Sequence, residues 1–186
     1  MEARRNSLSF GVVGLAILLA GCSTLSSVPA DVERVIEDVC EFDRDPQPEG
    51  LSGISCSGGD RYFCVDDRGG LLHEVEILLG EEGDVESFAV KRSVRLEGRV
   101  DLEGCAYDPL DGRVWVSDEK DTSIRQFDPE SGRETAQAEL PEVFRKNVRS
   151  NRSVEGLSIT PDGFRMYVAN EDTLSCDGAP ADETAG

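Results

Sequence analysis

From about residue 50 onwards, short apolar runs alternate with polar, turn-forming residues. Three copies of one pattern recur there: a short apolar strand that contains a glycine, a turn rich in Gly and Asp, and a second strand that contains aromatic residues. The copies span residues 51–68, 102–119 and 154–171. Their glycines lie 51 and 52 residues apart, at Gly53, Gly104 and Gly156. The pattern predicts three β-hairpins inside an internal repeat.

The segments between the hairpins predict two further strands for each of the first two copies. These strands cover residues 72–79 and 88–96, then 123–127 and 134–140. Four strands in about 50 residues is the size of a β-propeller blade. We therefore expect an all-β fold, a partial β-propeller of about two and a half blades over residues 49–178, followed by a polar tail at 179–186. Because a ring needs about four blades, we expect a truncated product, or less readily pairing with another chain.

The N-terminal residues predict a targeting segment that is not part of the fold. Arg4 and Arg5 precede an apolar run at 8–20, which is too short to span a bilayer but has the length of a signal-peptide core. Small residues then lead to Cys22, and this arrangement resembles the bacterial lipobox. The resemblance implies a signal peptide at 1–21, lipid (palmitate among its acyl chains) on Cys22, and a membrane anchor in the cell envelope. Ser23 resembles the pattern for the outer membrane, facing the periplasm.

Two short segments separate this anchor from the repeats. Residues 22–30 are small and polar, so they predict a flexible tether. Residues 31–48 contain apolar side chains at helical spacing and predict a short helix or a first strand that leads into the repeats.

The charge and the cysteine content limit which partners, metal ions and disulfides we expect. The chain has 38 acidic and 19 basic residues, a formal net charge of −19, which repels nucleic acid and attracts divalent cations. The oligomeric state stays open. No C-x-x-C pattern exists, so a structural zinc site is not expected. Export permits a Cys56–Cys64 disulfide, and the alternative is that these cysteines are small buried apolar residues.

Carboxylates recur at the ends of the predicted strands. Glu103 and Glu155 begin first strands, and Glu119 and Glu171 end second strands. A hairpin returns the chain to its starting edge, so these acids can meet at one rim. We expect Glu103 and Glu155 to act in catalysis, and Ca²⁺ to be held by a second set: Asp66, Asp118, Glu119 and Glu171. The alternative is that these acids cap turns and accept bonds from backbone amides.

Basic residues are few in this chain, and two are candidates for binding an anionic ester substrate. Arg68 aligns with Glu119 and Glu171 when the copies are counted from their first strands. Arg152 closes a basic set that precedes the third copy: Arg145, Lys146, Arg149 and Arg152. The alternatives are an ion pair for Arg68 and a solvated loop for the basic set. No G-x-S-x-G elbow exists, and His73 lies within a predicted strand, where a structural role is expected.

The ordered set of motifs resembles a known bacterial family. Leu51-Ser52-Gly53-Ile54, Asp101-Leu102-Glu103-Gly104, Ser117-Asp118-Glu119 and Asn170-Glu171 are similar to the "esterase-like activity of phytase" (phytase-like) family. The resemblance implies an exported β-propeller that hydrolyses phosphate or other esters. Ser153 stands where the family pattern suggests Gly, and the later part of the family domain is absent. The alternatives are a non-catalytic propeller that binds a ligand or a protein, and an inactive truncated product.

Overall fold

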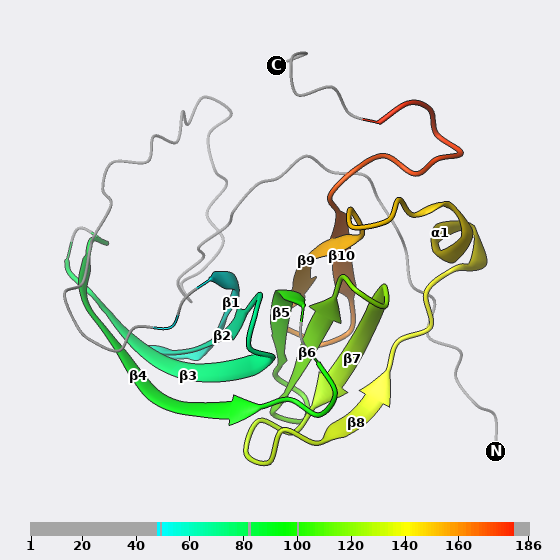
Figure 1. Ribbon diagram of the computed structural model, residues 1–186. Coiled ribbons are helices and arrows are strands. Elements are labelled where there is room, and N and C mark those ends of the chain that lie inside the picture. Colours follow the sequence, from blue (N-terminus) through cyan, green and yellow to red (C-terminus); the bar gives the residue numbers. More distant parts are fainter. Residues whose placement is uncertain (1–47, 49, 82, 100, 181–186) are drawn as a thin grey trace.

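The fold is built from antiparallel sheets that match the predicted repeats. A computed structural model describes residues 48, 50–81, 83–99 and 101–180 (Figure 1). The first sheet has the order β1-β2-β3-β4 and the second β5-β6-β7-β8, while β9 and β10 form a two-stranded sheet. This arrangement confirms the all-β, partial-propeller prediction for the described residues. The expected signal peptide at 1–21, the tether at 22–30, nearly all of the segment at 31–48 and the end of the polar tail lie outside the described residues.

The strand bounds follow the hydrophobic pattern closely. The first sheet consists of β1 (Leu51–Gly58), β2 (Arg61–Asp66), β3 (Leu71–Leu79) and β4 (Val85–Arg95). The second consists of β5 (Leu102–Asp108), β6 (Arg113–Asp118), β7 (Ser123–Phe127) and β8 (Glu134–Gln137). The third hairpin is β9 (Val154–Ile159) and β10 (Met166–Asn170). The structure therefore confirms each expected strand, with β8 shorter and β4 longer than the pattern indicated.

The hydrophobic cores lie between neighbouring sheets. One buried cluster joins the first two sheets through Phe63, Val65, Val114 and Val116, and the ring of Phe63 stacks on Tyr107 with centroids 5.9 Å apart. A second cluster joins the second and third sheets and includes Ile124, Val154, Trp115, Leu157 and Val168. Both faces of the middle sheet are thus covered, which is how successive propeller blades stack.

The first strands β1, β5 and β9 lie side by side where the three sheets meet (Figure 1). A Cβ on Gly53 would lie 2.7 Å from the carbonyl oxygen of Glu103, and one on Gly104 would lie 2.6 Å from that of Glu155. Only glycine permits backbones to approach so closely. The repeated glycine therefore marks the place where one blade meets the next.

A short helix, α1 (Glu142–Asn147), was not expected from the sequence. Pro141 is its N-cap residue and makes no side-chain capping bond. Its residue Phe144 is buried in the cluster between the second and third sheets. Arg145 and Lys146 of the basic set lie in its last turn. Among the described residues, no helix has the length and apolar character needed to cross a membrane.

The described cysteines are all free thiols: Cys56, Cys64, Cys105 and Cys176. Cys56 pairs with Tyr62 across the first hairpin, and Cys64 pairs with Ile54. The two cysteines are therefore diagonal neighbours, about 7–8 Å apart, which exceeds the usual Cα separation in a disulfide. The alternative of small buried apolar residues therefore holds for Cys64 and Cys105, whereas Cys56 and Cys176 are exposed thiols.

Candidate functional site: a carboxylate cluster where the blades meet

Each first strand has an irregularity at the residue that precedes the repeated glycine.

 The register of pairing shifts between Leu51 and Gly53, between Leu102 and Cys105, and between Val154 and Gly156. The extra residue is Ser52 in β1 and Glu155 in β9. In β5 the irregular stretch contains both Glu103 and Gly104. Such β-bulges re-aim a side chain without ending the strand. The two glutamates that the sequence singled out therefore occupy bulges.

A backbone hydrogen bond closes each hairpin at this same edge. The amide of Asp67 donates to the carbonyl of Gly50 at 2.9 Å. The amide of Glu119 donates to Asp101, and that of Glu171 donates to Ser153, each also at 2.9 Å. These bonds show that Asp67, Glu119 and Glu171 are the equivalent residues of the three hairpins.

This equivalence corrects the alignment that was expected for Arg68. The first hairpin is one residue shorter than the others between its glycine and its closing bond, so counting along the sequence places Arg68 where the structure has Asp67. The side chain of Arg68 is 77% exposed, and its Nε lies 3.5 Å from Asp67 Oδ1. The expected ion-pair alternative for Arg68 is thus present, although with Asp67 rather than with Glu103 or Glu119.

Five carboxylates converge at the edge where the first strands meet. Asp101, Glu103 and Glu119 can each offer one oxygen so that all three oxygens lie within 4.8 Å of one another. Glu119, Glu155 and Glu171 form a second such group. We call these five residues the rim cluster. Glu119 belongs to both groups, so it is the central residue of the rim cluster.

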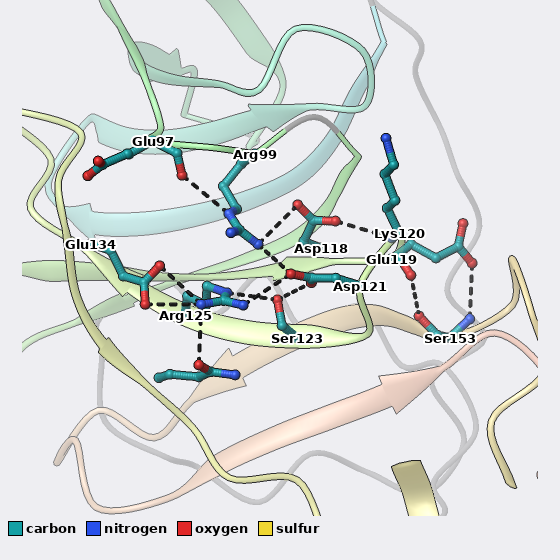
Figure 2. Close-up of polar contacts among 11 residues, drawn as sticks. Glu97, Arg99, Asp118, Glu119, Lys120, Asp121, Ser123, Arg125, Glu134 and Ser153 are labelled. Carbon is teal, nitrogen blue, oxygen red and sulfur yellow. Dashed lines mark hydrogen bonds and ion pairs between the residues drawn. The ribbon is translucent and has the colours of Figure 1, made fainter. Parts of the chain in front are cut away.

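Glu119 is held in place by the start of the third blade. Its side chain is buried, with the residue 8% exposed, and Oε1 accepts a hydrogen bond from the amide of Ser153 at 3.0 Å. The hydroxyl of Ser153 donates to the backbone carbonyl of Glu119 at 3.2 Å (Figure 2). The departure from the family pattern at Ser153 therefore has a structural use, because a glycine there lacks the hydroxyl that makes the second bond.

The rim cluster shifts the protonation of its own members. Burial raises the pKa of Glu103 from its ordinary 4.5 to about 7, and the charge of Glu155 adds to the rise, while a hydrogen bond from Ser52 opposes it. Burial also raises the pKa of Glu155, with further contributions from Glu119 and Glu171. Like charges that are drawn together favour the protonated form. The cluster therefore attracts protons or cations.

The raised pKa of Glu103 predicts how stability depends on pH when no cation is added. Between pH 4.5 and about 7, the folded chain keeps a proton on Glu103 that the unfolded chain releases. The folded state binds more protons in this window, so the free energy of unfolding should fall as pH rises through it. Glu103→Gln should flatten that decline in urea unfolding curves measured in EDTA. Glu97→Gln, at an exposed glutamate outside the cluster, should keep the full decline; equal pH dependence of both variants would contradict the assignment.

Two predicted metal ligands lie outside the rim cluster. Asp118 Oδ2 lies 3.7 Å from Arg99 Nη1, and Asp118 Oδ1 accepts from the amide of Lys120 at 3.1 Å. Figure 2 shows this aspartate in a network with Arg99, Asp121 and Arg125, beside Glu119 but directed away from it. Asp66 Oδ1 accepts from the amides of Gly69 and Leu71 at 3.0 and 2.9 Å. Both aspartates thus match the alternative of turn-capping and ion pairing.

Arg152, the second candidate for substrate binding, is engaged within the chain. Its Nη1 donates to Asp172 Oδ2 at 3.3 Å, and Arg149 Nε lies 3.6 Å from the same oxygen. These three residues line an open hollow of about 540 Å³. Arg152 therefore pairs with a buried carboxylate. This arrangement is closer to the solvated-loop alternative than to a substrate contact.

Asp101 is the member of the cluster that the sequence interpretation missed. It directly precedes Leu102, so it lies just outside the predicted strand. Its position corresponds to Gly50 and Ser153 in the other hairpins, since these three residues accept the closing backbone bonds. The signal in the sequence that could have indicated Asp101 was its fixed distance from the repeated glycine.

The sheets and their acidic rim define a protein of the β-propeller type with a carboxylate cluster where its first strands meet. Residues 47–185 match the Phytase-like family, described as "Esterase-like activity of phytase". The chain belongs to this family, which confirms the resemblance found in its sequence motifs.

A solved structure of low identity shares the fold. Glutaminyl cyclase from Myxococcus xanthus aligns with a TM-score of 0.50 at 14% identity and covers 67% of this chain and 52% of its own. Hydrazine synthase from Kuenenia stuttgartiensis aligns with a TM-score of 0.43 at 20% identity over 74% of this chain and 32% of its own. This chain spans about half the length of the glutaminyl cyclase. A search of curated proteins finds no match.

Proposed function

We propose that this chain is an envelope-anchored esterase that hydrolyses phosphate or carboxylic esters with the help of Ca²⁺ at the rim cluster. The observation that carries the proposal is the convergence of five carboxylates, with oxygens of two overlapping groups within 4.8 Å of one another. Family membership supports ester hydrolysis as the reaction class.

The donor set suits a hard divalent cation. Ca²⁺ takes six to eight oxygen ligands, mainly carboxylates and carbonyls, and the rim cluster offers only oxygen atoms. The raised pKa of Glu103 and Glu155 supports the same conclusion, because both shifts come from burial and from neighbouring negative charge. A bound cation would offset that charge and polarise the ester oxygen.

Glu103 and Glu155 are the proposed acid and base. Both lie on bulges at the same edge, and their side chains are only partly buried, so an ester can approach them. Without a bound cation the pKa of Glu103 is about 7, so this group can take up or release a proton near neutrality. In this proposal one glutamate accepts the proton of the attacking water, and the other donates a proton to the leaving alcohol. Arg68, exposed at the neighbouring turn, is the proposed contact for an anionic substrate.

An activity assay tests this function. Purified full-length chain should hydrolyse p-nitrophenyl phosphate or p-nitrophenyl acetate faster in Ca²⁺ than in EDTA. Glu103→Gln/Glu155→Gln should lower the Ca²⁺-dependent rate by about 100-fold or more, the typical contribution of a positioned acid or base. The control Glu97→Gln/Glu139→Gln, at two exposed glutamates outside the cluster, should keep the wild-type rate. Equal rates for both double variants would reject the proposal.

Cell fractionation tests the membrane anchor. The lipobox-like residues that lead to Cys22 support the proposed lipid anchor in the outer membrane, facing the periplasm. Cys22→Ser should move the protein from the membrane fraction to the soluble fraction. Retention of the variant in the membrane would count against the anchor.

The alternative function is a ligand-binding module without turnover. Ca²⁺ binding without hydrolysis of either ester would favour that alternative.

A further inference from the structure

Three polar side chains that are not members of the rim cluster lie together on one face of the first blade. His73 on β3 pairs directly with Cys64 on β2 and with Ser93 on β4. Asp66 lies two residues after Cys64, so it is on the same face of the sheet. The three strands thus bring Asp66, His73 and Ser93 into one row.

One hydrogen bond and one longer contact connect the three side chains. Ser93 Oγ lies 2.8 Å from His73 Nδ1, and His73 Nε2 lies 3.7 Å from Asp66 Oδ2. His73 is 4% exposed and Asp66 6%, whereas Ser93 is exposed to solvent. A buried base therefore meets an accessible hydroxyl.

The position of Asp66 favours the tautomer of His73 that carries its proton on Nε2. Its Oδ1 accepts two backbone amides, which fix the carboxylate and leave Oδ2 towards the ring. His73 Nε2 is buried and has no hydrogen bond within ordinary distance, so Asp66 is the acceptor that faces its proton. The proton on Nε2 leaves a lone pair on Nδ1, and the Ser93 hydroxyl donates to it. Burial also lowers the pKa of His73, which keeps the ring neutral.

The surroundings of Ser93 leave it open to a small reactant. β4 is the edge strand of its sheet among the described residues. Glu74 pairs with Arg92, and Val75 with Val90, so Lys91 forms a bulge two residues from Ser93. Bulges and edges expose backbone amides that are not used by a neighbouring strand, and such amides can stabilise an oxyanion.

We propose that Ser93 is an activated nucleophile, with His73 as its general base and Asp66 as the residue that orients His73, for small activated carboxylic esters. Ser93 Oγ forms a bond to the acyl carbon while its proton passes to His73 Nδ1. The alcohol then leaves with that proton, and an acyl-serine remains. Water, deprotonated by His73, cleaves the acyl-serine to the carboxylic acid and restores the hydroxyl. This centre needs no metal and does not depend on the rim cluster.

Covalent labelling in EDTA tests the proposal. A fluorophosphonate probe should label the full-length chain at Ser93, as located by mass spectrometry, and Ser93→Ala should abolish labelling. His73→Gln and Asp66→Asn should each slow labelling, His73→Gln by about 100-fold or more. Ser131 is the matched internal control, because it is exposed and bonds to a carboxylate, Asp128, without a histidine.

The outcomes separate this centre from the proposed function. Ser93 is exposed, so Ser93→Ala should keep the wild-type unfolding curve even if the variants of buried residues are destabilised. Labelling of Ser93 no faster than of Ser131, or unchanged labelling in Ser93→Ala, would overturn the proposal. EDTA should remove hydrolysis that depends on the rim cluster while Ser93 labelling persists, so failure of one activity leaves the other measurable.

Discussion

Gly104→Ala should lower the free energy of unfolding by about 3 kcal/mol, at the upper end of the cost of overpacking a core. A Cβ at this position would lie 2.6 Å from the carbonyl oxygen of Glu155 and 2.8 Å from the amide nitrogen of Leu157. Both contacts are with backbone atoms of β9, which cannot move aside without separating the second and third blades. Chemical denaturation of the purified chain measures the loss.

Gly156→Ala is the matched control for this effect. Gly156 holds the same repeat position, but a Cβ there would meet only Ala169 Cβ, at 3.3 Å, among the described residues. We expect its free energy of unfolding to change by less than about 1 kcal/mol, as for most substitutions without a backbone clash. Similar losses for the two variants would show that the close approach of β5 to β9 is not the cause.

If the rim cluster binds Ca²⁺ as proposed, Glu119→Gln should weaken that binding by at least about 100-fold. Even residues that only support a metal ligand typically contribute 10- to 100-fold to affinity, and Glu119 is shared by both groups of the rim cluster. Glutamine keeps an oxygen that can accept the amide of Ser153, so the variant removes the charge while leaving the local fold its hydrogen bond.

Isothermal titration calorimetry with Ca²⁺ measures this change. Glu139→Gln, at an exposed glutamate outside both groups, should bind as the wild type does. Wild-type affinity in Glu119→Gln would show that the rim cluster is not the cation site. Loss of binding with a lowered unfolding temperature of the Ca²⁺-free variant would instead point to a structural role for Glu119.

The sequence predicted the repeats well because their hydrophobic alternation, glycines and turns all have the same period. It predicted that Glu103, Glu119, Glu155 and Glu171 meet because each hairpin returns the chain to one edge. The register within the first hairpin was harder. Its turn is one residue shorter, and this difference moved the assignment from Asp67 to Arg68.

Side-chain direction and cross-strand contacts account for the remaining differences. Asp118 is the last residue of β6 and Glu119 begins the turn that follows. Asp118 contacts Arg99 and Lys120 instead of the rim cluster. His73 and Ser93 are 20 residues apart, and only the register of β3 with β4 brings them together. A lone histidine in a predicted strand gave no indication of a serine partner.

The bulges on the first strands assign strand pairing and the presentation of a side chain at the rim to different residues. In each blade the ladder on either side of the bulge maintains the pairing, while the bulged residue itself faces the rim. Ser52, Glu103 and Glu155 occupy this place in successive blades without altering the strand that holds them. The chemistry of the rim can therefore diversify one blade at a time, since a new side chain at a bulge leaves the inter-strand bonds of the scaffold intact.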